Sequence, residues 1–416
     1  MKPVRGILAE LITRRARLAT FLAGFLSISI FALVYTGWSG PVGSPTRALV
    51  AMSSPDHKSP EVRQVVFAKV HKAASSTVQN ILLRFALARN LTVLFPRAGA
   101  LISQITSRIP RRKMVPLPEG KDKYDILCNH AVYNETEIAK YFSEDAVRVA
   151  ILRDPMRQAI SALVYYYTNY PTRTLVKAVE KYADDPINMF LRHPQDFYRP
   201  NAKHGPMTSY INNRMSLDLG FDSHELESSK HNDTKIEAFI NRVDKEFDLV
   251  LISEYFDESM VLLRRYLHWS MKDIIYLKVN TARKQSARSP FSRKPNISDQ
   301  VLQTFRQWDK IDYELYEHFL PRFLKTIKSE LYFEAEVKAF KEIQVLVKDF
   351  CSNKTTHQDL KIGQSVWSGN FSVSKLDCKL MSKEEVDMVN IVRAKQISRY
   401  QRPRRKPSSL KDFDKS

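Results

Sequence analysis

The sequence predicts an α/β domain with a central, mainly parallel sheet flanked by helices and preceded by one transmembrane helix. Short apolar runs alternate with helical patterns from residue 63 onward, which is the order expected when helices connect neighbouring parallel strands. Near the N-terminus, no charged residue occurs from Leu18 to Tyr35, and about 20 apolar residues suffice to cross a bilayer as a helix. The chain therefore divides into a membrane anchor and a globular body.

The composition indicates that this body is globular and basic. The chain has 416 residues, 44% of them hydrophobic, and its 65 Lys and Arg outnumber its 45 Asp and Glu to give a formal net charge of +20. Such a chain can bury a sizeable core, and only 11 glycines and 3 cysteines exclude a collagen-like repeat and a disulfide-dense scaffold. The charge predicts a polyanionic partner: nucleic acid, a phosphate-rich cofactor, a sulfated glycan or an acidic membrane.

The basic residues around the apolar run predict its orientation. Five of them precede it, Lys2, Arg5, Arg14, Arg15 and Arg17, whereas the next one after it is Arg47. Because positive residues favour the cytosolic side, we expect a cytosolic tail at 1–17, a signal anchor at 18–38 and a lumenal remainder. A cleaved signal peptide is the alternative, and both interpretations place the body in the secretory pathway. Residues 39–62 are rich in Pro, Ser and Gly, which is typical of a stem.

The glycosylation sequons agree with a lumenal body. All six N-x-S/T sequons follow the apolar run, at Asn90, Asn134, Asn232, Asn296, Asn353 and Asn370. A protein that faces the lumen does not meet chromosomes, so we expect no nucleic-acid partner. The excess positive charge then matches an anionic nucleotide, a glycan or a membrane surface.

The body begins with a strand followed by a helix. Residues 65–70, VVFAKV, form a β-branched apolar run that is typical of a buried parallel strand. After the polar turn HKAASS, apolar residues recur at helical spacing, at Val78, Ile81, Leu82 and Phe85. We therefore expect an amphipathic helix that begins near Ser75, Ser76 or Thr77.

Further apolar runs extend the pattern. We expect strands at 147–152 (VRVAIL), 248–252 (DLVLI) and 274–279 (IIYLKV), and a strand end after the YDILC run at 124–128. From Gln300 to Val347 the pattern is helical, with Trp308, Ile311, Leu315 and Phe319 on one face. Residues 170–245 are too irregular to assign. We expect one catalytic domain over 63–335, its helical extension over 336–400 and a basic disordered tail over 401–416.

An anion site is predicted at the turn between the first strand and its helix. Residues 69–77, KVHKAASST, place small side chains where free backbone N–H groups and the helix dipole favour a phosphate. Lys72 adds a charge, and the hydroxyls of Ser75, Ser76 and Thr77 add donors. The Walker A pattern is absent, because the lysine precedes the small residues. An ordinary capped helix with exposed basic residues is the structural alternative.

A second anion site is predicted where the run 147–152 ends. This run leads directly into Arg153-Asp154-Pro155, and Ser161 lies eight residues beyond Arg153 on the expected helix. The guanidinium offers a fork for bidentate contacts, and Pro155 suits the first position of a helix. Two anion sites at the carboxyl ends of neighbouring parallel strands fit a nucleotide with separated phosphates.

These motifs resemble the cofactor signature of sulfotransferases. More narrowly, five segments resemble the Golgi galactose-3-O-sulfotransferases: HKAASSTVQNILLRF, ILRDP with the following YYY, LDLGFD at 217–222, LVLISEYFDESMVLL at 249–263, and the W-D-x-x-D-Y-E-L-Y-E-H-F stretch from Trp308. The sequence departs from that family at Ala73 and at Asn129, where Thr and His are usual. The likeness spans residues 63–400.

The resemblance implies the fold, the chemistry and the partners. It implies a P-loop-like sulfotransferase domain that takes sulfate from 3′-phosphoadenosine 5′-phosphosulfate, without a metal, and transfers it to the 3-hydroxyl of a terminal galactose. The acceptor would be galactosylceramide or a related galactolipid, with glycoprotein glycans as the alternative. The implied enzyme is a single-pass Golgi membrane protein with a lumenal catalytic domain. A homodimer is compatible with this arrangement. The rival class is a membrane-tethered basic lectin without chemistry.

The resemblance also implies roles for individual residues. Lys72 would bind the phosphosulfate bridge, Ser75, Ser76 and Thr77 the 5′-phosphate, and Arg153 and Ser161 the 3′-phosphate. His71 is our first choice for the base and His130 the second, with a structural histidine as the alternative for His130. Lys69 would add charge near the sulfuryl group or lie solvated at a strand edge.

Three further features remain open at this stage. Asn213 and Asp218, in or before LDLGFD, suit contacts to the acceptor hydroxyls or a structural turn. In the basic loop TARKQSARSPFSRK, Arg283 or Lys284 would close over the 3′-phosphate or remain solvated. Cys351 and Cys378 are expected to pair in an oxidising compartment and leave Cys128 free.

Overall fold

A computed structural model describes residues 59–103, 106–198, 210–229, 231–278, 290–292, 297–355 and 358–400. Internal contacts divide the chain into Met1–His57 and Lys58–Ser416, and the description that follows concerns the second unit. The expected tail, anchor and most of the stem lie outside the described residues, as do Asn296, Arg283, Lys284 and the C-terminal tail. Among the described residues, no helix has both the length and the apolar character needed to cross a bilayer.

The core of the fold is a four-stranded parallel sheet. Its strands are β1 (Val65–Ala68), β2 (Ile126–Leu127), β3 (Val147–Leu152) and β4 (Leu249–Ile252), in the order β2-β1-β3-β4. Val65 pairs with Val147 across β1 and β3, and Val149 pairs with Leu249 across β3 and β4. All four residues of β1 are buried, because the sheet is covered on both faces. The strands expected from residues 65–70, 147–152 and 248–252 are confirmed.

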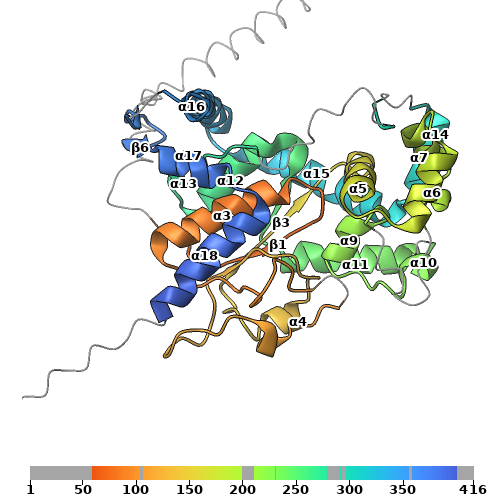
Figure 1. Cartoon of the computed structure of the whole chain (residues 1–416), viewed down its shortest axis with the longest axis horizontal. Coiled ribbons are helices and arrows are strands. Elements are labelled where there is room, and N and C mark those ends of the chain that lie inside the picture. The colour runs from red at the N-terminus through yellow and green to blue at the C-terminus, as the bar shows by residue number, and fades with distance from the viewer. Residues whose placement is uncertain are drawn as a thin grey trace, which may run out of the picture. The chain divides into compact units, whose positions relative to one another are not determined.

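Helices on either side of the sheet fall into two hydrophobic clusters. The larger cluster includes α3 (Ser75–Arg89), α11 (Asp233–Glu246) and α12 (Phe256–Leu267). The smaller one joins α5 (Pro155–Asn169), α6 (Arg173–Lys181), α7 (Pro186–Arg192) and α8 (Pro194–Phe197). Figure 1 shows α5, α6 and α7 gathered at one end of the view, together with α14 (Asp299–Trp308). Much of the stretch that the sequence left unassigned is thus helical.

Short elements connect these helices. They are α4 (Glu135–Ile138), α9 (Arg214–Asp218), α10 (Leu226–Ser229), α13 (Met271–Ile274) and two 3₁₀ helices at Arg111–Lys113 and Ser253–Tyr255. The helical pattern expected from residue 300 to 347 is also divided, into α14, α15 (Lys310–Ser329) and α16 (Phe333–Ser352). Ile311, Leu315 and Phe319 share the larger cluster, whereas Trp308 packs against the smaller one. The single expected face is therefore split at the break between α14 and α15.

The strand expected at residues 274–279 is wrong for its described part. Residues 271–274 form α13, and residues 275–278 run on without a strand partner. Gln344 on α16 supplies the hydrogen bonds instead: its amide oxygen accepts from the Tyr276 N–H at 3.2 Å, and its amide nitrogen donates to the Tyr276 carbonyl at 3.2 Å. A helix side chain therefore satisfies backbone groups that a sheet would otherwise pair.

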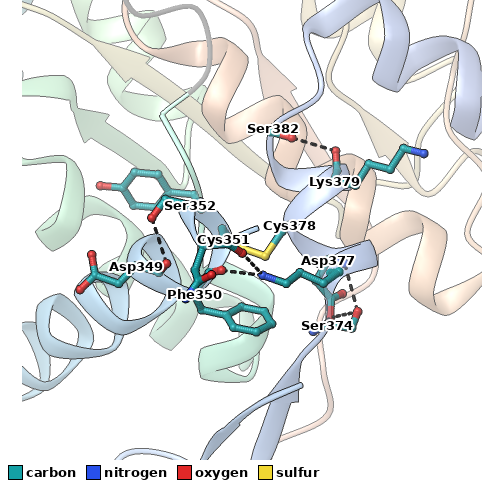
Figure 2. Close-up of a disulfide and its surroundings, with 12 residues drawn as sticks. Asp349, Phe350, Cys351, Ser352, Ser374, Asp377, Cys378, Lys379 and Ser382 are labelled. Atoms are coloured by element: carbon teal, nitrogen blue, oxygen red, sulfur yellow. Dashed lines mark hydrogen bonds between the residues drawn. A yellow bond between two sulfur atoms is a disulfide. The ribbon is translucent and has the colours of Figure 1, made fainter. Parts of the chain in front are cut away.

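The C-terminal segment combines helices with a small hairpin. Strands β5 (Leu360–Ile362) and β6 (Phe371–Val373) pair antiparallel, so the expected extension is not purely helical. The disulfide Cys351–Cys378 joins α16 to α17 (Lys375–Met381), as Figure 2 shows, and Cys128 is free and buried. The expected pairing is confirmed. The last helix, α18 (Glu385–Tyr400), packs along α3 (Figure 1).

Candidate functional site

The loop that joins β1 to α3 has the backbone geometry of an anion site. We call residues 69–77 the anion loop. Lys72 and Ala74 both adopt left-handed conformations, with φ of 59° and 60°. Non-glycine residues rarely tolerate this region, and such strain concentrates at functional sites. Residues that alternate between right-handed and left-handed backbone conformations turn successive N–H groups toward one point. In addition, no side chain caps the N-terminus of α3. The loop can therefore receive an anion.

The end of β3 holds this loop from the side. Arg153, the residue after β3, donates from Nη1 to the carbonyl of Lys72 at 2.8 Å. Gln158 on α5 donates to the carbonyl of His71 at 3.1 Å. Burial lowers the pKa of Arg153. The structure thus brings Arg153 to the anion loop, while Ser161 lies half-buried further along α5.

The side chain of Lys72 lies on an aromatic ring. Its Nζ is 3.8 Å from the centroid of the Tyr165 ring, a cation–π contact. Burial, together with the neighbouring charges of Arg153 and Lys69, lowers the pKa of Lys72 to about 8. Tyr165 therefore contacts the anion loop through Lys72. Tyr166 instead stacks on Tyr210, with ring centroids 4.1 Å apart.

His71 is fixed by a buried carboxylate. Asp218 accepts from the His71 backbone N–H at 2.8 Å and lies 2.8 Å from the ring Nδ1. Since a carboxylate only accepts, the proton of the ring resides on Nδ1, and Nε2 carries a lone pair. Arg214 donates to Asp218 at 2.7 Å and approaches Nδ1 more weakly, at 3.3 Å. The structure therefore presents His71 with an unprotonated Nε2.

The electrostatics keep His71 neutral. Burial, together with the charges of Arg214 and Lys69, lowers its pKa to about 4, although Asp218 acts in the opposite direction. Asp218 itself has a pKa lowered to about 2, because the charge of Arg214 and the hydrogen bonds that His71 donates outweigh the effect of burial. The pair is thus a neutral imidazole held by an ionised carboxylate, which is the arrangement of a histidine base and its orienting acid.

His130 is placed differently, although it stacks on His71 with ring centroids 3.8 Å apart and planes inclined by 19°. Its Nδ1 lies 3.0 Å from the carbonyl of Lys69, and its Nε2 lies 2.8 Å from Nζ of Lys69. The carbonyl accepts and the ammonium donates, so the lone pair on Nε2 is already used. Burial also lowers the pKa of His130 well below its ordinary value. Of the two histidines, His71 has the more available lone pair.

Lys69 is a buried ammonium ion, not a solvated edge residue. Only 2% of it is exposed, and its Nζ contacts His130, Ser76 Oγ at 3.4 Å and Glu385 Oε2 at 2.8 Å. Burial thus overturns the solvated alternative. Glu385 on α18 also accepts from the Ser76 hydroxyl at 3.1 Å.

The three hydroxyls of the anion loop are not equivalent. Ser75 donates its hydroxyl to the carbonyl of Val70 and so closes the loop internally. Ser76 is half-buried and paired with Glu385, and Thr77 is buried in the first turn of α3. The backbone of the loop is therefore its main group for an external anion, because the Ser76 hydroxyl already donates to Glu385.

Asn213 and Asp218 act within the protein in this structure. Asn213, with φ of 43°, donates its backbone N–H to Asp309 and accepts from the Asp312 N–H at 3.1 Å. Both residues are at most 3% exposed. In this structure the two side chains contact other parts of the protein and do not face an acceptor. Asn213 joins α9 to α15, and Asp218 holds His71.

The Trp308–Tyr313 motif explains how α9 is held. Asp312 accepts from the backbone N–H groups of Met215 and Ser216 at 3.0 and 2.7 Å. Burial raises the pKa of Asp312 to about 6 and that of Asp309 well above its ordinary value. After α9, Gly220 has φ of 85°, and a Cβ there would lie 2.3 Å from the Tyr133 carbonyl oxygen. These contacts fix the helix that carries Arg214 and Asp218.

Two residues of the site were missed from the sequence. Arg214 lies four residues before Asp218, a spacing that places both on one helix face and that could have been noticed. Glu385 lies 316 residues after Lys69, and no motif marks it. A cavity of about 430 Å³ lies elsewhere, beside the disulfide, and no predicted site residue lines it. Within the described ranges, no group of three or more His, Cys, Asp or Glu is placed to hold a metal.

Comparison with known proteins identifies relatives of most of the chain. The model of the galactose-3-O-sulfotransferase family matches residues 4–361. Galactose-3-O-sulfotransferase 2 of Sus scrofa is 32% identical over 309 residues, which cover 74% of this chain and 72% of the relative. Galactosylceramide sulfotransferase of Homo sapiens is 30% identical over 324 residues, with 74% and 72% covered. The family match contains the anion loop, Arg153 and α9, and it ends before α18.

Proposed function

Because this chain belongs to the galactose-3-O-sulfotransferase family, we propose that it transfers sulfate from 3′-phosphoadenosine 5′-phosphosulfate to the 3-hydroxyl of a terminal galactose on galactosylceramide or a related galactolipid. The observation that carries the proposal is a neutral histidine, His71, oriented by Asp218 at 2.8 Å within the anion loop. A basic lectin needs a positive surface but has no use for an oriented base.

The anion loop would bind the 5′ end of the donor. The left-handed residues Lys72 and Ala74 direct backbone N–H groups to one point, where the 5′-phosphate would lie. The Ser76 hydroxyl, which donates to Glu385 in this structure, would turn to the phosphate when the donor binds. Arg153, whose Nη1 is 2.8 Å from the Lys72 carbonyl, would bind the 3′-phosphate of the same nucleotide. Ser161 would assist Arg153 from α5. The two phosphates would then lie at the carboxyl ends of β1 and β3.

His71 would act as the general base. Its Nε2 accepts the proton of the galactose 3-hydroxyl as the galactose oxygen forms a bond to sulfur. The bond between sulfur and the bridging oxygen breaks, and adenosine 3′,5′-bisphosphate leaves with that electron pair. Lys72, whose pKa of about 8 keeps it charged at lower pH, would leave the Tyr165 ring and stabilise the leaving oxygen.

The acceptor and the membrane setting complete the proposal. Relatives named for galactosylceramide and for galactose lie at similar identity, 30% and 32%, so the galactolipid rests on the sequence motifs and the proposed anchor. With residues 18–38 in a Golgi membrane, the catalytic domain over 63–335 and its extension over 336–400 would face the lumen. The half-exposed Tyr165 and the exposed Tyr170 offer aromatic faces for a sugar at the bilayer surface. Galactose-terminated glycoprotein glycans are the second candidate acceptors.

An acceptor panel tests the proposal. The full chain in detergent is incubated with labelled sulfate donor and galactosylceramide, lactosylceramide, N-acetyllactosamine or a heparan precursor, and mass spectrometry maps the sulfated position. We expect 3-O-sulfated galactose with the highest kcat/KM for galactosylceramide, and no transfer by Lys72→Ala. Preference for N-acetyllactosamine would contradict the galactolipid alone. Sulfation of heparan only, or an active Lys72→Ala, would contradict the proposed reaction.

A further inference from the structure

The C-terminal helix brings a carboxylate into the candidate site from beyond the family match. That match ends at residue 361, whereas α18 covers Glu385–Tyr400. Glu385 Oε2 lies 2.8 Å from Nζ of Lys69, and Glu385 Oε1 lies 3.9 Å from Nε2 of His130. The side chains of Lys69 and Glu385 are 1% and 18% exposed. An ion pair that is largely shielded from solvent therefore links α18 to the anion loop.

The hydrogen-bond directions around Lys69 form one consistent set. The Lys69 ammonium has three N–H groups and three acceptors: His130 Nε2 at 2.8 Å, Glu385 Oε2 at 2.8 Å and Ser76 Oγ at 3.4 Å. Ser76 in turn donates its own proton to Glu385. Glu385 is thus the counter-charge of Lys69, which donates to Glu385 and to His130 at the same time.

This hydrogen bond fixes the ring on which the proposed base lies. With Nζ of Lys69 on one ring nitrogen and the Lys69 carbonyl on the other, His130 has one tautomer and one orientation. His71 stacks on that ring at 3.8 Å. Glu385, Lys69, His130 and His71 therefore form a continuous series of contacts from α18 to the base.

We propose that Glu385 is a positioning residue for His71, acting through Lys69 and His130. Asp218 sets the tautomer of His71 from one side, and Glu385 sets the surface that supports its ring from the other. The inference rests on the proposed function, in which His71 is the base. It makes α18, which the family match does not include, part of the catalytic arrangement.

Several contacts of α18 do not involve Glu385, so a variant at residue 385 can be tested. Gln396 makes two hydrogen bonds with the backbone of Val93, at 2.9 and 3.1 Å. Arg399 donates to the Leu91 carbonyl at 3.0 Å. Met388, Val389 and Val392 are buried. These contacts hold the helix on α3 when the charge at residue 385 is removed.

The test compares Glu385→Gln with Asp387→Asn in the full chain. Asp387 lies in the same helical turn, but its side chain is 61% exposed. We expect Glu385→Gln to lower kcat by about tenfold, since small misplacements of reacting groups have effects of at least this size. The affinity for adenosine 3′,5′-bisphosphate, measured by calorimetry, should change little. Asp387→Asn should match the wild type, and Glu385→Asp should restore part of the lost kcat.

The pH dependence gives a readout that a merely structural role would not change. The charged and titratable groups that face His71 are Asp218 and Arg214 from α9, Lys69 from its own loop, His130 after β2, Tyr210 before α9 and Glu385 from α18. Loss of the Glu385 charge disfavours the imidazolium, so the acid limb of kcat/KM should move below the value near 4. Ring NMR of labelled histidines should show the same coupling, with altered His130 nitrogen shifts, without any turnover.

Three outcomes would overturn the inference. They are an unchanged kcat and pH profile in Glu385→Gln, unchanged His130 shifts, or a bisphosphate affinity at least tenfold tighter at constant kcat. The last would make Glu385 an anion that competes with the donor. If Glu385→Gln fails to fold, the pair replacement Lys69→Met with Glu385→Leu removes both charges of this ion pair and should lose kcat while remaining folded. If the wild type has no sulfotransferase activity but Glu385→Gln still alters the His130 nitrogen shifts, the proposed function is contradicted. The coupling between Glu385 and His130 is not.

Discussion

The two sides of the His71–His130 stack are built from similar groups but differ in one respect. On one side, α9 supplies Asp218, which contacts His71 Nδ1 at 2.8 Å. On the other, α18 supplies Glu385, but Lys69 lies between this carboxylate and His130. A carboxylate in direct contact places a proton on Nδ1 and leaves Nε2 available, whereas an intervening ammonium uses the Nε2 lone pair. The presence of Lys69 on one side only therefore explains why His71 can act as a base whereas His130 supports its ring.

The largest expected effect on kcat comes from replacing His71 or His130 by glutamine. His71→Gln should lower kcat by about 10²- to 10⁴-fold, the usual contribution of a general base. His130→Gln keeps an oxygen that can accept from Lys69 and should lower kcat by about tenfold. Single-turnover rates with saturating donor measure both. Equal losses in the two variants would contradict the distinction between base and support.

A second prediction concerns the direct carboxylate contact. Asp218→Asn leaves the Arg214 guanidinium, 1% exposed, without its ion-pair partner, and should lower the free energy of unfolding by about 3–5 kcal/mol at pH 7. The folded pKa of Asp218 is lowered from 3.8 to about 2. Its stabilisation is therefore complete above pH 4 and is lost as the pH falls toward 2.

Denaturant unfolding at pH 7, 5 and 3 measures this difference. The gap between wild type and Asp218→Asn should be equal at pH 7 and 5 and smaller at pH 3. Asp222→Asn, at an exposed aspartate nearby, is the matched control and should stay within about 0.5 kcal/mol of the wild type. A gap that grows on acidification would refute the ion-pair account.

The smallest effect is expected at another buried aspartate. Asp309 has one oxygen without a hydrogen-bond partner among the described residues, and burial together with Asp312 raises its pKa well above the ordinary value. Because no ion pair with Asp309 is present among the described residues, Asp309→Asn should change the free energy of unfolding by less than about 1 kcal/mol at pH 7. Thermal unfolding measures it. A loss as large as that of Asp218→Asn would show that burial, and not pairing with Arg214, explains both.

The sequence by itself determined the part of the molecule in which local pattern and chemistry coincide. The runs at β1, β3 and β4 are short, apolar and β-branched, so their burial followed from composition. KVHKAASST lies between a strand and a helix, and RDP follows the next strand of the sheet, so the carboxyl ends of β1 and β3 had to lie at one edge. The sequence made Cys351 and Cys378 candidates for a disulfide, and the structure decided that they pair.

Only the tertiary structure decided how the polar side chains are used. Asn213 and Asp218 are polar residues near a turn, and their sequence fits acceptor contacts as well as internal ones until α15 is packed against α9. The apolar run at 274–279 predicts a strand, but Gln344 of α16 pairs with its backbone.

Glu385 reaches Lys69 across 316 residues, because α18 packs along α3. A hydrogen bond depends on a few tenths of an ångström and on the direction of the donor. Sequence periodicity fixes which face of an element is buried, but it does not fix which two elements bring their polar groups within that distance.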